Sequence, residues 1–263
     1  LKKSEIEISY ICDNKKNIKK LKKIKLIKNW EDAKNFDVDL VIISTPTNIS
    51  EKIAKRFSGK FNMLIEKPIT TNLKLIKRIT SNSFKNKKIL KTGYNLRFDE
   101  GLLKVKKILN QRKIGKIYYL KITYANGAAK TNTNRVGSLV DMGAHSINLI
   151  QWFFHNSKIN IKNNIGQKNE FYNKKKIDNG FITLEINKII CFLHHGFCSW
   201  KNQFNLEISG SKGYVNVSSL SKWGNQIVSF GLRKYPSGFP KIKSWEYKKD
   251  DSWRRETIYV INS

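Results

Sequence analysis

One lysine, Lys67, stands where this chain could bind and polarise a ligand. With Glu66 and Pro68 it ends a short apolar stretch, residues 61–65. The stretch follows an alternation of predicted strands and helices, and open parallel sheets bind their ligands just beyond the carboxyl ends of their strands. An acid and a cation fixed there by a proline are placed for cofactor and substrate chemistry. A solvated Glu-Lys turn before a helix would explain the same three residues without any ligand.

A second candidate for chemistry is the pair Asp141 and His145 in the predicted helix 138–154. A spacing of four puts both side chains on one helix face, apart from the apolar stripe of this segment. The carboxylate can orient the imidazole, and Gly143 between them lets another group approach the backbone closely. Such a pair can also be purely structural. No third His, Cys or carboxylate lies at a diagnostic spacing, so we expect no metal site.

Two weaker signals follow other predicted strands. Asp13 ends the first strand, where a carboxylate commonly accepts hydrogen bonds from a ribose diol and disfavours a 2′-phosphate. An ordinary Asp-Asn turn is the alternative. Ser44, Thr45 and Pro46 follow the apolar stretch 40–43 and could lie beside a dinucleotide, although a simple strand-to-helix cap explains them equally well.

The elements that must position these residues alternate at first between strands and helices. Strands are predicted at 6–12, 25–27, 40–44, 61–65 and 88–92, with helices at 15–23, 30–36, after Pro46 and at 72–81. This is the rhythm of a parallel sheet covered on both faces. We therefore predict a partial Rossmann domain, a doubly wound parallel sheet, over residues 1–93.

After Gly93 the periodicity shifts toward two. A helix at 100–111 and another at 138–154 accompany predicted strands at 117–124, 180–186, 189–197, 204–209, 214–217, 227–232 and 256–261. Short strands separated by Gly and Asn turns favour an open antiparallel sheet. We predict that residues 94–263 form a second domain for substrate binding and oligomerisation.

Composition limits the classes of partner. The chain has 263 residues and a net charge of +31, which would normally suggest a polyanion partner. Only eight cations are arginine, and the lysines are spread over every segment, so we expect no specific nucleic acid. Three cysteines without a CxxC pair predict neither a zinc ribbon nor a disulfide framework, which favours the cytoplasm. No apolar run approaches the roughly 18 residues of a spanning helix, so we expect no membrane association.

The order of several motifs resembles one known family. These are VDLVIISTPT (38–47), IEKPIT (65–70), GYNLRF (93–98), KIGKIYYLK (113–121) and LVDMGAHSINL (139–149). Together with Asp13 and the stretch 192–217, they resemble the glucose-fructose oxidoreductase, inositol dehydrogenase and MocA (Gfo/Idh/MocA) family of NAD(P)-dependent oxidoreductases. Each motif is short, but their order is specific, and the resemblance runs from about residue 5 to residue 253.

The resemblance implies a sugar or nucleotide-sugar dehydrogenase that uses NAD, with NADP possible. Lys67 and His145 would flank the reacting carbinol, with His145 as general base or acid and Asp141 orienting it. Arg97 would line the substrate edge. The residues implied to bind the cofactor are Asp13, Ser44, Thr45, Pro46, Glu66, Lys67 and Asn95. An open sheet with aromatic residues on its faces would further favour a homo-oligomer.

A departure from the family pattern stands against this interpretation. The sequence contains no GxGxxG loop, on which the pyrophosphate normally rests. We therefore expect a chain truncated at its N-terminus, with the central strand lost and its apolar neighbours exposed, and truncated at its C-terminus as well. The alternative to an active oxidoreductase is a non-catalytic or inactive fragment that serves as a binding or interaction protein on the same scaffold.

Overall fold

The computed structural model describes residues 6–13, 24–129, 136–155, 157–169, 175–236 and 238–263. The chain divides into two compact units. Unit 1 comprises Leu1–Gly93 with Thr257–Ser263, and unit 2 comprises Tyr94–Glu256. Within the described ranges, no helix combines the length and the apolar character needed to cross a bilayer.

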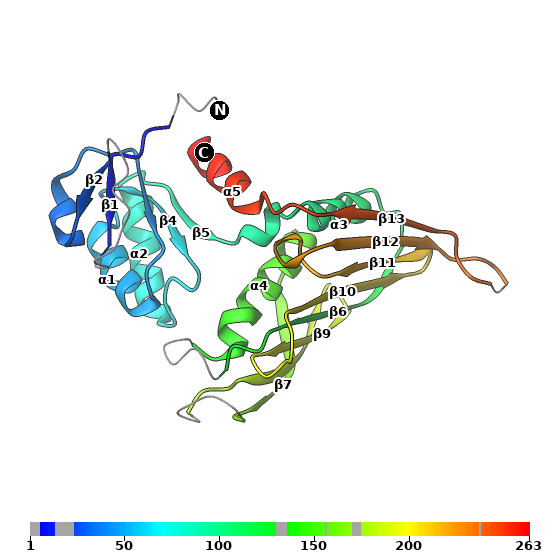
Figure 1. The fold of residues 1–263 in the computed structure, drawn as a ribbon. Helices are drawn as coiled ribbons and strands as arrows, with labels where there is room; N and C mark the ends of the chain where they lie inside the picture. Colours follow the sequence, from blue (N-terminus) through cyan, green and yellow to red (C-terminus); the bar gives the residue numbers. More distant parts are fainter. Residues whose placement is uncertain (1–5, 14–23, 130–135, 156, 170–174, 237) are drawn as a thin grey trace. The chain divides into compact units, whose positions relative to one another are not determined.

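Unit 1 contains two separate parallel ladders (Figure 1). One pairs β1 (Tyr10–Cys12) with β2 (Lys25–Ile27), and the other has the order β3 (Leu40–Ile43), β4 (Asn62–Glu66) and β5 (Leu90–Gly93). In a Rossmann sheet one further strand lies between the strands that correspond to β1 and β3. Among the described residues β3 is the outer strand of its ladder, and Ile42 on it is 54% exposed.

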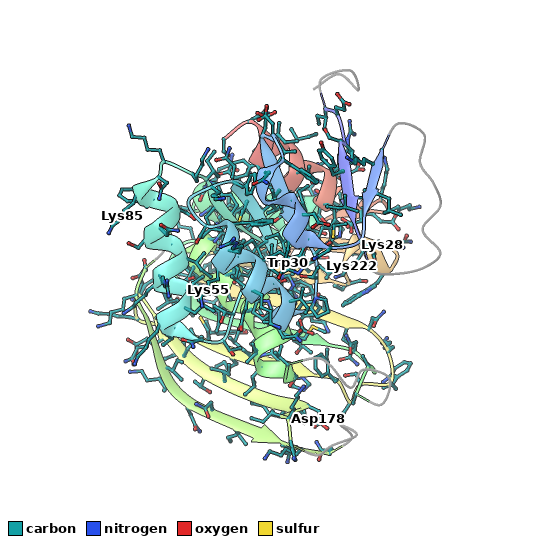
Figure 2. The ribbon with its side chains drawn as sticks, turned by 90° about the vertical axis from the view of Figure 1, so that its left-hand side faces the viewer. Lys28, Trp30, Lys55, Lys85, Asp178 and Lys222 are labelled. Atoms are coloured by element: carbon teal, nitrogen blue, oxygen red, sulfur yellow. The ribbon has the colours of Figure 1, made fainter. Side chains whose placement is uncertain are left out.

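The helices of unit 1 bury one face each. In α1 (Thr47–Phe57) and α2 (Leu73–Lys85), side chains such as Ile53, Phe57 and Ile79 join the strands in one apolar core. Asn72 begins α2 by accepting hydrogen bonds from the backbone N–H groups of its first turn. The opposite faces carry exposed lysines, among them Lys55 on α1 (Figure 2).

Unit 2 is built on an eight-stranded sheet with the order β13-β12-β11-β10-β6-β9-β8-β7. Of its seven neighbouring strand pairs, six are antiparallel and one, β6 with β9, is parallel. The strands are β6 (Ile117–Ala125), β7 (Ile159–Gln167), β8 (Asn179–Ile186), β9 (Ile189–Gly196), β10 (Gln203–Gly210), β11 (Gly213–Ser218), β12 (Gln226–Leu232) and β13 (Ile242–Tyr247).

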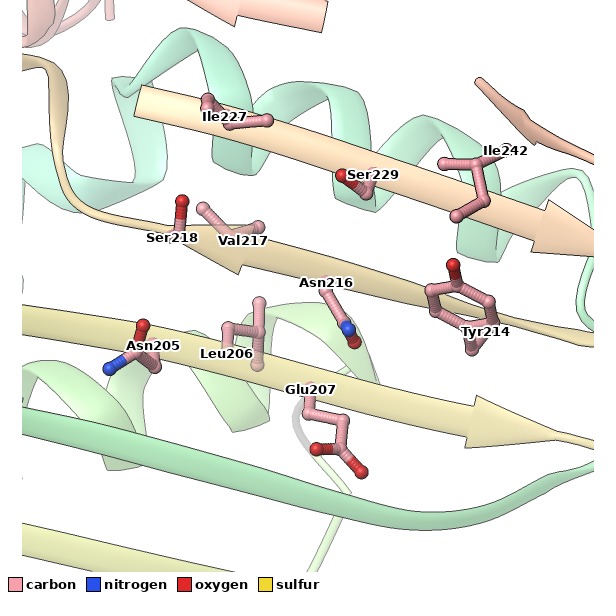
Figure 3. A pocket seen from close by; sticks show the side chains of 10 residues that line it. All are labelled: Asn205, Leu206, Glu207, Tyr214, Asn216, Val217, Ser218, Ile227, Ser229 and Ile242. Atoms are coloured by element: carbon pink, nitrogen blue, oxygen red, sulfur yellow. The ribbon is translucent and has the colours of Figure 1, made fainter. Parts of the chain in front are cut away.

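Two helices cover one face of this sheet. Alternate side chains of the strands, such as Leu120, Leu193 and Ile208, form one core with α3 (Glu100–Asn110) and α4 (Ser138–Phe153). The other face carries a mixture of polar and apolar side chains. A shallow depression on it is lined by strands β10 to β13, with Glu207 and Asn216 among its polar groups (Figure 3).

Several predicted elements of the fold need correction. Residues 256–261 were predicted as a strand but belong to helix α5 (Ser252–Ile261), and residues 30–36 form a 3-10 helix, η2 (Trp30–Asn35). Strands β7 and β13 were missed, because they lie at the sheet edges and have no apolar alternation. The sheet is mixed, not purely antiparallel, since the chain passes through α4 between β6 and the strands that follow. The helix predicted at 15–23 lies outside the described residues.

A buried polar network joins α3 to the sheet. Asp99, 3% exposed, caps α3 by accepting from the backbone N–H of Leu102 at 3.0 Å. It also accepts from Gln226 Nε2 at 2.8 Å and from the Ser221 hydroxyl at 3.0 Å. The Gln226 amide oxygen in turn accepts from the backbone N–H of Gly101 at 3.1 Å. Burial raises the pKa of Asp99, although these hydrogen bonds act in the opposite direction.

This network predicts a difference between two substitutions of Asp99. Asp99→Ala leaves three buried donors without an acceptor and should lower the free energy of unfolding by about 2–4 kcal/mol. Asp99→Asn keeps one oxygen for the cap and can donate to the Ser221 hydroxyl, so it should cost less than about 1 kcal/mol. Urea unfolding followed by circular dichroism measures both.

The sign of the pKa shift of Asp99 determines how the stability of the protein depends on pH. A folded-state pKa above its ordinary value means that the native state holds the proton more tightly than the unfolded state. The contribution of Asp99 to stability is therefore complete below the ordinary pKa of about 3.9 and is lost as pH rises through the raised value. Asp99→Asn should remove this change of the unfolding free energy with pH. An unchanged pH dependence in Asp99→Asn would contradict the assignment of the raised pKa to Asp99.

Candidate functional site

In unit 1, two groups of predicted site residues lie side by side at one edge of the sheet. Strands β3 and β4 are parallel and pair Ile43 with Ile65, so the residues that follow each strand emerge at the same edge. Ser44 and Pro46 are exposed there, and Lys67 is half-buried. The structure thus brings together the predicted cofactor residues of the β3 and β4 ends.

Glu66 is held close to the next strand. It pairs with Gly93 at the end of β5, where a Cβ would lie 3.1 Å from Glu66 Oε1. A larger side chain at position 93 would displace the Glu66 carboxylate from this position. Asp13 is half-buried after β1, which belongs to the other ladder of unit 1.

In unit 2, Asp141 and His145 lie one turn apart on α4, as the spacing predicts. Asp141 is in the first turn, and His145 is 7% exposed. The imidazole lies edge-on to the ring of Tyr94, at a centroid distance of 6.0 Å, and 5.7 Å from the ring of Tyr124. Two aromatic walls therefore restrict the directions in which the imidazole can point.

An exposed lysine, Lys222, lies beside Tyr124. Lys222 lies in the 3-10 helix η4 (Ser221–Trp223) and donates from Nζ to the Tyr124 hydroxyl at 3.1 Å. Its ammonium also lies 4.9 Å from the ring of Trp223. The sequence analysis missed Tyr94, Tyr124 and Lys222. The end of strand β6 could have indicated Tyr124, but no sequence signal connects residue 222 to α4, the helix that carries the DxGxH motif of Asp141, Gly143 and His145.

Arg97 and Asn95 occupy the 3-10 helix η3 (Asn95–Phe98) and have partners within unit 2. Arg97 Nε donates to Asn148 Oδ1 on α4 at 2.6 Å, one turn beyond His145. Asn95 is 3% exposed and donates from Nδ2 to the Ser252 hydroxyl at 3.0 Å. The structure therefore places Arg97 beside the helix that carries Asp141 and His145, while Asn95 joins η3 to the start of α5.

Comparison with known proteins defines the class of this architecture. Residues 102–216 match the family model described as the GFO/IDH/MocA C-terminal domain. Inositol 2-dehydrogenase/D-chiro-inositol 3-dehydrogenase of Shouchella clausii is 22% identical over 189 residues, which are 70% of this chain and 54% of that protein. The chain thus spans about half the length of that relative.

Solved structures agree in fold. The crystal structure of a probable oxidoreductase, yhhX, has a TM-score of 0.80 at 15% identity and covers 98% of this chain and 82% of that chain. Levoglucosan dehydrogenase in complex with NADH and L-sorbose has a TM-score of 0.74 at 14% identity, covering 90% and 70%. The fold is thus that of oxidoreductases with a Rossmann-like sheet and a large mixed sheet. Over residues 102–216 the chain is thus similar to the C-terminal domain of the Gfo/Idh/MocA family.

The hydrogen bond between Arg97 and Asn148 predicts that substitutions of these two residues have non-additive effects on the free energy of unfolding. Arg97→Met and Asn148→Leu should each lower the free energy of unfolding by about 1–3 kcal/mol, because each leaves a polar partner without its hydrogen bond. The double variant should lose clearly less than the sum of the two losses. Denaturant unfolding of the four proteins measures the coupling, and strictly additive losses would mean that the bond contributes nothing.

Proposed function

We propose that this chain belongs to an NAD(P)-dependent oxidoreductase that transfers a hydride between nicotinamide and a carbinol or ketone carbon of a sugar or nucleotide sugar. The observation that carries the proposal is the geometry of His145. A protonatable ring stands on a rigid helix, one turn from a carboxylate and between two aromatic rings. The names of the relatives, an inositol dehydrogenase and a levoglucosan dehydrogenase, agree with it.

The residues present in unit 1 fit a dinucleotide. The exposed ends of β3 and β4 offer small polar groups and a carboxylate at the edge where parallel sheets bind such ligands. Ser44, Thr45 and Pro46 would lie along the cofactor, Glu66 near the nicotinamide ribose, and Asp13 at the other ribose diol. An acid at position 13 favours NAD over NADP. When bound, the nicotinamide takes up the hydride.

Side chains of this protein would accept the hydroxyl proton and stabilise the charge on the oxygen. In alcohol oxidation the C–H electron pair leaves with the hydride while the O–H bond breaks, and the hydroxyl proton passes to the imidazole of His145. Lys67 would donate a hydrogen bond to the same oxygen and stabilise the charge that develops there. Asp141 would orient the imidazole, and Arg97 would bound the substrate. The reverse reaction returns the proton to the oxygen.

The roles of Lys67 and His145 predict a kinetic signature. In the protein as its gene encodes it, Lys67→Ala and His145→Ala should each lower kcat by about 10²–10⁴-fold, the usual contribution of a positioned acid–base group. NADH affinity, measured by fluorescence titration, should change by less than about threefold, because neither group carries the pyrophosphate. Lys55→Ala and His155→Ala alter exposed residues elsewhere and serve as controls. Unchanged turnover in both site variants would reject the assignment.

We further propose that the open face of the eight-stranded sheet binds a second copy of the chain. Apolar side chains on this face remain accessible, including Phe181 at 48%, Phe192 at 47% and Ile242 at 55% exposure. Phe181 stacks on His194 at 4.5 Å, which gives this face a flat aromatic pair over β8 and β9. Accessible apolar surface of this kind marks association sites.

Sedimentation velocity tests this association. The unmodified protein should sediment as a dimer or larger species, and Phe192→Glu should shift it to monomer by placing a charge in the apolar contact. Phe84→Glu changes an aromatic residue on α2, outside the sheet, that is 84% exposed, and it should leave the oligomer intact. A monomer at every concentration for the unmodified protein would end the proposal.

A further inference from the structure

The chemistry proposed for His145 leaves a second histidine, His195, unexplained. His195 lies on β9 and faces α4, with 0% of its surface exposed. Its Nε2 is 2.9 Å from the hydroxyl oxygen of Ser146, which is also 0% exposed. A histidine among the apolar residues of a core needs a reason, because burying a polar ring costs free energy unless its nitrogens are hydrogen-bonded.

The second ring nitrogen of His195 faces the glycine of the DxGxH motif. A Cβ on Gly143 would lie 3.4 Å from His195 Nδ1, so a residue larger than alanine would collide with the ring. Nδ1 has no hydrogen-bond partner among the described residues. The close approach expected at Gly143 is thus made by this imidazole.

Burial fixes the protonation state of the ring. It lowers the pKa of His195 to about 3, with the neighbouring His194 adding to the effect, so the imidazole is neutral at physiological pH. A neutral ring has one N–H, and buried N–H groups are left unpaired less often than buried acceptors. We infer that the proton lies on Nε2 and that His195 donates to the Ser146 hydroxyl.

The geometry of an α-helix relates this bond to His145. Successive residues are about 100° apart around the helix axis, so Gly143 and Ser146 share one side of α4. His145 is about 160° from Gly143 and about 100° from Ser146, so it points away from the stripe that meets β9. Apolar contacts on that stripe would allow small rotations of the helix, whereas a directional hydrogen bond does not.

We propose that His195 is a positioning residue, whose hydrogen bond to Ser146 fixes the rotation of α4 about its axis and thereby the direction of the His145 side chain. The inference deepens the proposed function and rests on it for its catalytic meaning. The placement of His145 relative to the rings of Tyr94 and Tyr124 can be measured without any turnover.

Substitutions that remove or retain the bond test the proposal. His195→Leu has a similar size but no donor, Ser146→Ala removes the acceptor, and His195→Gln places an amide nitrogen near the position of Nε2. Ile208→Ala, at a fully buried site on β10, is the matched control because it loses core packing without altering a polar contact to α4.

The first readout is NMR of the His145 ring in this chain. In His195→Leu and Ser146→Ala, the ring proton resonances of His145 should shift, and its NOEs to Tyr94 and Tyr124 should weaken. His195→Gln should restore both, and Ile208→Ala should leave both unchanged. His145 resonances that do not move in His195→Leu would overturn the proposal, as would equal changes in Ile208→Ala.

The second readout is turnover in the protein as its gene encodes it. His195→Leu should lower kcat by about tenfold, because a small misplacement of a catalytic group is costly, while the KM for the sugar stays within about twofold. His195→Gln should recover most of the rate. If the His145 resonances shift in His195→Leu but the unmodified protein shows no dehydrogenase turnover, the proposed function is rejected and the positioning role of His195 stands. Normal turnover in His195→Leu would reject the positioning alone.

Discussion

The packing of α4 on the inner face of the eight-stranded sheet is the constraint on which the candidate site of unit 2 depends. The helix carries Asp141 and His145 one turn apart and buries Leu149 and Phe153 in the turns that follow. Tyr124 on β6 and His195 on β9 contact it from two strands that pair in parallel. If the helix turned or slid, the carboxylate, the imidazole and the aromatic walls would lose their common geometry.

Much of the fold could be predicted from local patterns. The apolar run of β4 reflects burial on two faces, and the alternation of β6 and β8 to β12 reflects burial on one face, so hydrophobic periodicity indicates these strands directly. Edge strands such as β7 have no such pattern, since their side chains are exposed on both faces. Residues 256–261 alternate like a strand, yet they form a helix in which Glu256 and Val260, one turn apart, are both buried.

The sequence indicates candidate site residues only where one short segment contains the chemistry. The EKP turn and the DxGxH helix are contiguous motifs, so Lys67, Asp141 and His145 could be named from the sequence. Lys222 and Tyr124 meet across 98 residues of chain, and His195 meets Ser146 across 49. Sheet topology creates these contacts, and no local pattern encodes it. At Gly143 the sequence indicated that another group could approach the backbone closely, but it did not identify this group as His195.

The central claim is that Lys67 and His145 act on one hydroxyl group. A crystal structure of the protein with NADH and a bound, unreactive sugar tests it most directly. We predict that Lys67 Nζ and a ring nitrogen of His145 both lie within about 3.2 Å of the same sugar oxygen. A cofactor-bound structure in which the two side chains open onto separate surfaces would contradict the account.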